Sequence, residues 1–126
     1  MKIAIIGAGN LGISIAKGLI LNNAITSLYL SKRKIGDIAE FKDFPKVEIT
    51  PDNKLAVQNS DILILAVQPL QLENVLHEIK DLLTENHVLI STVTGFAISR
   101  MESIVGDRNI IRAMPNTAIA VGKSMT

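Results

Sequence analysis

Short apolar runs alternate with helically spaced apolar residues along almost the whole sequence. The first run, Lys2–Ile6, is nearly continuous and rich in β-branched residues, which is typical of a strand covered on both faces. Apolar residues then recur at intervals of three and four through residues 11–20, the pattern of an amphipathic helix. Strands that alternate with helices pair in parallel through right-handed crossovers. The alternation predicts a doubly wound, mostly parallel α/β fold.

The same reasoning divides the rest of the chain. Further strands are predicted at residues 27–30, 47–49, 61–67, 87–91 and 109–113, with one more short strand at 118–121. Helical segments are predicted at residues 35–41, 55–58, 72–83 and 98–105. No linker or repeat interrupts the pattern, so we expect residues 1–126 to form one domain.

Composition excludes several classes of function. Hydrophobic residues make up 48% of the chain and charged residues 20%, which is incompatible with intrinsic disorder. The formal net charge of +1 excludes a polybasic nucleic-acid binder. There is no cysteine, hence no disulfide or thiolate site, and no apolar run approaches the roughly 18 residues of a membrane span. We expect a cytoplasmic protein with neither a nucleic-acid nor a membrane partner.

A glycine motif follows the first strand directly. The G-x-G-x-x-G pattern is formed by Gly7, Ala8, Gly9, Asn10, Leu11 and Gly12. The pattern alone is weak, but its place between an apolar strand and an amphipathic helix is the context of a dinucleotide site. The first glycine permits the tight turn, the second lets the backbone approach a pyrophosphate, and the third allows close helix–strand packing. The motif predicts a Rossmann-like dinucleotide-binding domain.

The end of the second strand indicates which dinucleotide is bound. An NAD site usually places Asp or Glu about 20 residues past the glycines. This chain has Ser31, Lys32 and Arg33 there instead. A hydroxyl and a guanidinium bind a 2′-phosphate, which a carboxylate would repel. The sequence therefore favours NADP.

No catalytic acid, base or nucleophile is evident. The histidines, His77 and His87, have no carboxylate at a metal-ligand spacing, so we expect structural or surface roles and no metal site. The acidic residues of the helix at 72–83, Glu78 among them, are expected on its solvated face. Because a nicotinamide supplies its own hydride, a domain that only binds and orients it needs no such group.

The chain resembles the N-terminal cofactor-binding domain of pyrroline-5-carboxylate reductase, the enzyme of the last step of proline biosynthesis. The resemblance covers essentially the whole chain. It rests on the glycine motif, on the segment L-A-V-Q-P at residues 65–69, and above all on R-x-M-P-N-T at residues 112–117. Generic dinucleotide-binding domains lack this last block.

The resemblance implies NADPH held by backbone groups of residues 8–11, with Ser31 and Arg33 near the 2′-phosphate. Further implied cofactor contacts are Asn53, Val67, Gln68, Thr94 and Asn116. The implied reaction is hydride transfer to the C=N bond of 1-pyrroline-5-carboxylate, the small-molecule substrate, giving L-proline. The resemblance assigns no catalytic residue.

Two departures and one expectation accompany the resemblance. Gln68 stands where the family usually has Lys, and Thr94 stands where it usually has Ala. The family carries a second, all-helical domain that forms a homo-oligomer and holds the substrate, so we expect this chain alone to bind NADPH with little or no turnover. Two alternatives remain open: a stand-alone, non-catalytic nucleotide-binding or regulatory protein, and another NADP-dependent imine or keto reductase.

Overall fold

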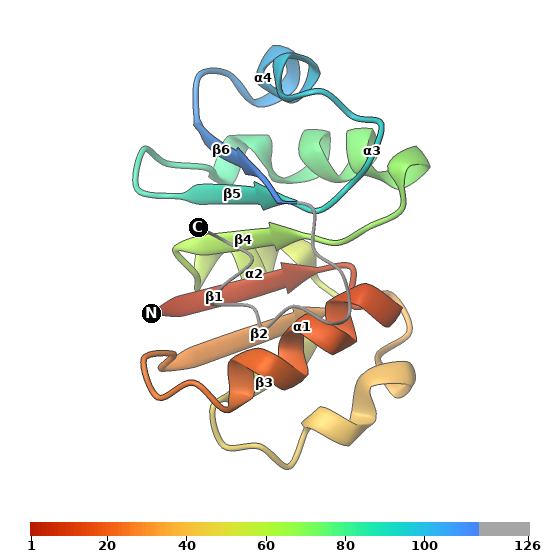
Figure 1. The fold of residues 1–126 in the computed structure, drawn as a ribbon, viewed down its shortest axis with the longest axis vertical. Helices are drawn as coiled ribbons and strands as arrows, with labels where there is room; N and C mark the ends of the chain where they lie inside the picture. Colours follow the sequence, from red (N-terminus) through yellow and green to blue (C-terminus); the bar gives the residue numbers. More distant parts are fainter. Residues whose placement is uncertain (114–126) are drawn as a thin grey trace.

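In the computed structural model, which describes residues 1–113, six strands form one sheet in the order β3-β2-β1-β4-β5-β6 (Figure 1). Every neighbouring pair is parallel. This order, which reverses direction beside β1, belongs to doubly wound dinucleotide-binding folds. The predicted fold class is confirmed. The strands are β1 (Lys2–Ile6), β2 (Ser27–Ser31), β3 (Val47–Thr50), β4 (Ile62–Leu65), β5 (Val88–Ser91) and β6 (Asn109–Arg112).

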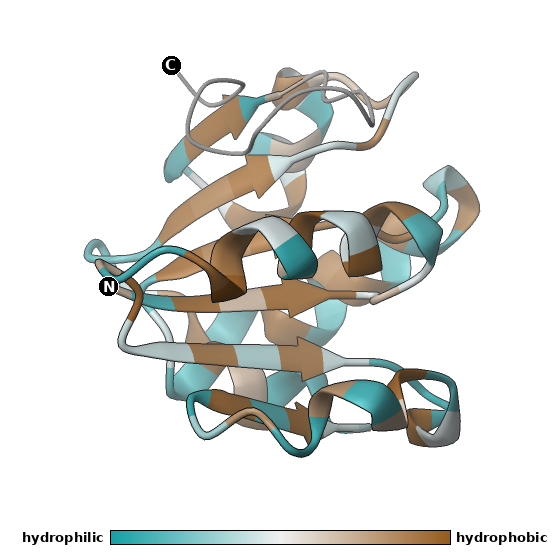
Figure 2. Cartoon of the chain, turned by 60° about the horizontal axis from the view of Figure 1, so that its bottom comes forward, coloured by the Kyte–Doolittle hydropathy of each residue, from teal (hydrophilic) through white to brown (hydrophobic). Residues whose placement is uncertain are grey.

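Helices cover both faces of the sheet. They are α1 (Asn10–Ile20), the 3-10 segment η1 (Ile35–Phe41), α2 (Asn53–Gln58), α3 (Pro69–Ile79), the 3-10 turn η2 (Lys80–Leu82) and α4 (Ile98–Val105). Because strand side chains alternate between faces, Ile3 and Ile5 join the core beneath α1 and η1, whereas Ala4 and Ile6 join the core beneath α2, α3 and α4. Burial on both faces explains why β1 is apolar from Ile3 to Ile6, after the exposed Lys2; in Figure 2 this strand, which follows the N label, begins teal and continues brown.

Some predicted boundaries differ from the structure. The helix predicted at 72–83 starts earlier, at Pro69, and ends at Ile79, where the chain tightens into η2. Proline suits this first position because its φ is already helical and the amide hydrogen it lacks would have no acceptor there. The strand predicted at 61–67 is limited to Ile62–Leu65, because the chain then turns toward the glycine motif. The strand predicted at 118–121 lies outside the described residues.

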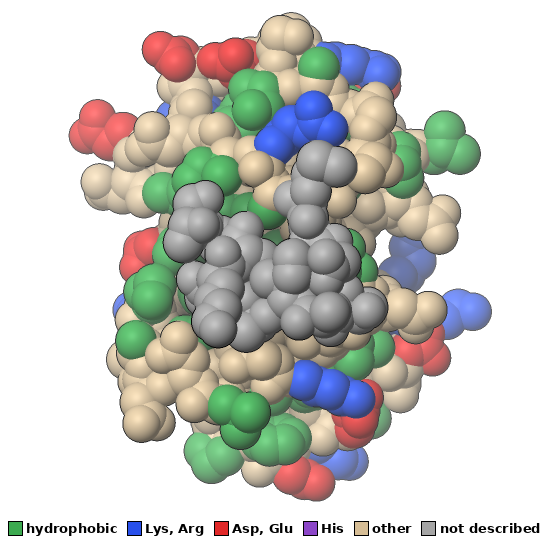
Figure 3. Space-filling model, viewed as in Figure 1, with side chains coloured by type: hydrophobic (Ala, Val, Ile, Leu, Met, Phe, Trp, Pro, Cys, Tyr) green, Lys and Arg blue, Asp and Glu red, His purple; other side chains and the backbone are tan. Residues whose placement is uncertain are grey.

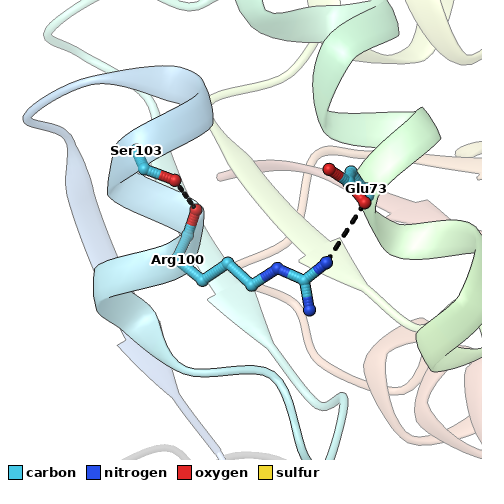
Figure 4. Close-up of polar contacts among 3 residues, drawn as sticks. All are labelled: Glu73, Arg100 and Ser103. Carbon is cyan, nitrogen blue, oxygen red and sulfur yellow. Dashed lines mark hydrogen bonds and ion pairs between the residues drawn. The ribbon is translucent and has the colours of Figure 1, made fainter.

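Arg100 links α4 to the neighbouring helix. Its guanidinium lies 4.5 Å from the centroid of the Phe96 ring and 3.2 Å from the Glu73 carboxylate of α3 (Figure 4). The Ser103 hydroxyl donates to the carbonyl of Arg100 at 2.6 Å. All three contacts lie on the α3–α4 side of the sheet, and the ion pair holds the Glu73 carboxylate toward α4.

One face of the molecule carries charges of both signs. Figure 3 shows Lys and Arg side chains interleaved with Asp and Glu over the coloured part of one face. Within the described part of the chain, no helix is both long enough and apolar enough to span a bilayer.

Ser60, between α2 and β4, carries a buried hydroxyl that finds no hydrogen-bond partner among residues 1–113. An unpaired buried hydroxyl costs free energy, so Ser60→Ala should raise the free energy of unfolding by about 1 kcal/mol. The matched control is Ser91→Ala, because the buried Ser91 hydroxyl accepts from the amide of Val93 at 3.3 Å. That variant should lose stability instead. Urea denaturation followed by circular dichroism measures both, and a destabilised Ser60→Ala would contradict the expectation.

Candidate functional site

A cleft of about 710 Å³ opens at the carboxyl edge of the sheet, where β1 and β4 end side by side. In open α/β sheets this point, at which the strand order reverses, is where ligands bind. The ends of β1 and β2, the start of α2 and one face of α3 contribute to its walls. The lining residues are Gly7, Gly9, Ser31, Lys32, Arg33, Lys34, Asp37, Pro51, Asn53, Ala66, Val67, Gln68, Gln71, Asn74, Val75 and Glu78.

The glycine turn forms the floor of the cleft. Gly7 has φ +82°, a conformation that residues with a side chain rarely adopt. The amides of Gly7 and Ala8 both donate to the carbonyl of Ser31, at 3.1 and 2.9 Å, which ties the turn to the end of β2. An added Cβ on Gly9 would meet no atom of residues 1–113 within 4 Å, so the backbone there faces open space.

α1 begins beside this space, directly after Gly9. Gly9 is the N-cap, and no side chain of residues 1–113 caps the helix. The first amides of a helix have no acceptor within it, and the helix dipole adds partial positive charge. An uncapped helix start beside an open glycine is a suitable environment for a phosphate group.

Basic residues form the wall beyond β2. Lys32 pairs with Asp37 at 3.4 Å, while Arg33 and Lys34 are exposed at the lip of the cleft. Neither Arg33 nor Lys34 has an ion-pair partner among residues 1–113, so both can face a second phosphate, in addition to the amides of α1. The donor set fits a phosphorylated dinucleotide, with positive groups at both ends of the space.

The facing wall is a hydrogen-bonded chain that links three elements. The Ser31 hydroxyl donates to Oδ1 of Asn53 at 2.6 Å, and Nδ2 of Asn53 donates to Oε1 of Glu78 at 2.8 Å. Ser31 is fully buried, and its one hydroxyl proton is used in this bond. The hydroxyl proton is therefore committed to Asn53, while the hydroxyl oxygen accepts from the amide of Gly7 at 3.4 Å.

The structure brings together only part of the predicted site. The predicted site residues that line the cleft are Gly7, Gly9, Ser31, Lys32, Arg33, Asn53, Val67 and Gln68. Ala8 is buried, and Asn10, Leu11 and Gly12 form the start of α1 outside the lining. Thr94 is exposed on the loop after β5 and does not line the cleft. Asn116 lies outside the described residues.

Sequence reasoning missed the contribution of α3. Glu78 is exposed, as expected, but it also lines the cleft together with Gln71, Asn74 and Val75. These positions recur at intervals of three and four, so they share one stripe of the helix beside its buried face. The intervals of three and four predict that these residues share one stripe of the helix. They do not reveal which polar stripe of the helix faces the edge of the sheet.

His87 has a structural role. It is buried, its Nδ1 lies 2.9 Å from the amide of Thr84, and its Nε2 lies 3.1 Å from the carbonyl of Val57. An amide donates and a carbonyl accepts, so the ring is the neutral tautomer protonated at Nε2. His77 is exposed on α3. Within residues 1–113 there is no group of three or more potential metal ligands.

Comparisons with known proteins agree with this geometry. The family model described as "NADP oxidoreductase coenzyme F420-dependent" matches residues 2–95. Pyrroline-5-carboxylate reductase 2 of Dictyostelium discoideum is 42% identical over 130 residues, a match that covers 99% of this chain and 44% of the relative. The chain thus corresponds to the N-terminal part of such reductases and spans less than half their length.

Solved structures of the same class superpose closely. A pyrroline-5-carboxylate reductase from Coxiella burnetii has a TM-score of 0.84 at 35% identity, covering 91% of this chain and 44% of its own. The pyrroline carboxylate reductase of Plasmodium falciparum, solved with NADP bound, has a TM-score of 0.79 at 30% identity. That match covers 97% of this chain and 45% of the other.

Proposed function

This chain belongs to the family of NADP oxidoreductases described as coenzyme F420-dependent, and on that premise we propose that it binds NADPH as the cofactor-binding half of a pyrroline-5-carboxylate reductase. In this proposal residues 1–126 act as one dinucleotide-binding domain. The observation that carries the proposal is the cleft itself, with the glycine turn at its floor and free basic groups at the end of β2. The NADP-bound relative supports the choice of cofactor.

Different residues of the chain bind different parts of the cofactor. The free amides at the start of α1 hold the pyrophosphate, and Lys32 and Arg33 hold the 2′-phosphate by charge-assisted hydrogen bonds. Val67 and Gln68 extend the cleft past the end of β4 and orient the remainder of the cofactor. When bound, NADPH supplies the hydride that adds to the carbon of the substrate C=N bond, while the nitrogen takes up a proton.

Arg33→Ala tests the cofactor assignment. Loss of a charge-assisted bond to the 2′-phosphate should raise the Kd for NADPH about tenfold or more and leave the Kd for NADH within about twofold. Lys17→Ala is the control, since Lys17 is an exposed cation on the last turn of α1 outside the cleft. Fluorescence titration of the chain with each nucleotide measures both constants. An equal loss of NADPH and NADH would exclude the 2′-phosphate role.

A second candidate is another NADP-linked reductase that shares this domain. The description of the matching family model, which names coenzyme F420, favours it. Assay of the full-length enzyme with NADPH separates the two. Reduction of 1-pyrroline-5-carboxylate to L-proline supports the first candidate, and reduction only of a deazaflavin or keto substrate supports the second.

The proposal extends to location and assembly. We expect a cytoplasmic enzyme whose small-molecule substrate is 1-pyrroline-5-carboxylate and whose complete form is a homo-oligomer. Light scattering of the full-length protein measures the assembly directly.

A further inference from the structure

Glu78 brings a carboxylate to the wall of the cleft from α3. Its Oε1 accepts from Nδ2 of Asn53 at 2.8 Å, and Oδ1 of Asn53 accepts from the Ser31 hydroxyl at 2.6 Å. An ionised carboxylate only accepts hydrogen bonds, so Glu78 decides which end of the Asn53 amide faces α3. The three side chains tie α3, α2 and β2 together beside the cleft.

These bonds also decide where the negative charge of Glu78 lies. An exposed glutamate on a helix ordinarily rotates into water, where its charge has little effect on its neighbours. The Asn53 amide instead holds this carboxylate at the wall, one amide group away from Ser31. Ser31 is followed directly by Lys32 and Arg33, which line the same cleft.

Resting on the proposed function, we propose that Glu78 is a specificity-determining residue that limits the preference of this cleft for a 2′-phosphorylated dinucleotide. A phosphate held by Lys32 and Arg33 would share the cleft with this carboxylate and be repelled by its charge. A free ribose hydroxyl carries no charge and is not repelled. NAD sites usually place their ribose-binding acid at the end of the second strand. Here Glu78 enters from α3, and the other acid that lines the cleft, Asp37, pairs with Lys32.

The test uses two small probes that differ only in the 2′-phosphate, adenosine 2′,5′-bisphosphate and adenosine 5′-monophosphate. Calorimetry gives their Kd values for the wild-type chain, Glu78→Gln and Glu78→Lys. The bisphosphate should bind about threefold tighter to the first variant and about tenfold tighter to the second, while the monophosphate stays within about twofold. The gain should shrink as salt rises from about 0.05 M to about 0.5 M, because salt screens exposed charges.

Glu73 provides a matched control on the same helix. It pairs with Arg100 on the α4 side and does not line the cleft (Figure 4). Glu73→Gln and Glu73→Lys make the same charge changes, and they should leave the ratio of the two Kd values unchanged.

The outcomes separate this inference from the proposed function. Suppose that the wild-type chain binds the bisphosphate. If the Glu78 variants then leave the ratio of the two Kd values unchanged, or the Glu73 variants change this ratio equally, the role of Glu78 is overturned. The proposed function stands in either case. If the wild-type chain binds neither these probes nor NADPH, the proposed function fails and the role of Glu78 fails with it.

Discussion

Gly7→Ala is expected to lower the free energy of unfolding by about 3 kcal/mol, because alanine fits neither the backbone conformation nor the packing at this turn. The left-handed backbone at φ +82° costs an L-residue about 1–2 kcal/mol. The added Cβ would also clash with Cγ1 of Val67 and lie 3.1 Å from its Cα, and such overpacking costs about 1–3 kcal/mol. Urea denaturation followed by circular dichroism measures the loss.

Two further variants test the cause. Gly36→Ala adds the same methyl group where it meets no atom of residues 1–113 within 4 Å, and it should change stability by less than about 0.5 kcal/mol. Val67→Ala removes the nearest clashing atom, so the double variant Gly7→Ala, Val67→Ala should lose less stability than the two single losses added together. A Gly7→Ala chain as stable as the wild type would show that the turn relaxes.

Gly9→Ala is expected to have the opposite profile: intact folding and lost binding. Gly9 has φ −79° and ψ −159°, an extended backbone that alanine adopts freely, and its Cβ would meet no described atom. That Cβ would occupy the space through which a pyrophosphate reaches the amides of α1, so the Kd for NADPH should rise about 30-fold or more.

The contrast between the two glycines is the informative measurement. Fluorescence titration with NADPH and urea denaturation are run on both variants under the same conditions. A Gly9→Ala chain that binds NADPH like the wild type would mean that the phosphates do not approach this turn. Loss of folding in that variant would mean that Gly9, like Gly7, is required by the packing of the chain.

The strands and helices were predictable because their signals are local. An apolar run such as Lys2–Ile6 must be covered on both faces whatever surrounds it. The apolar residues between positions 11 and 20 are spaced so that a helix carries them on a single stripe, which must be buried. The predicted boundaries near Leu65 and Ile79 were less accurate, because packing against other elements decides where a strand or a helix ends.

The candidate site was predictable where topology alone places residues. In a parallel sheet the strands end at one edge, so Gly7, Ser31 and Val67 were expected near one another, and all three line the cleft. Thr94 also follows a strand but does not line it, because β5 is one strand further from the point where the order reverses.

Glu78 shows what local patterns leave open. Its sequence context predicts an ordinary solvated acid, since charged residues usually lie on the solvent-exposed face of a helix. Glu78 is indeed exposed, and the crossing of α3 over the sheet decides in addition that its stripe with Gln71 and Asn74 turns toward the cleft. The bond from Asn53, 25 residues away along the chain, then holds the carboxylate there.

By itself, the sequence determined the α/β alternation, the glycine turn and the absence of an acid at the end of β2, because each depends on neighbours along the chain. Only the tertiary structure decided that the Ser31 hydroxyl donates to Asn53 and that Glu78 supplies an acid to the same cleft. The physical reason is that hydrogen bonds between separate elements depend on how helices rotate and cross over the sheet, and burial of the whole core sets that rotation.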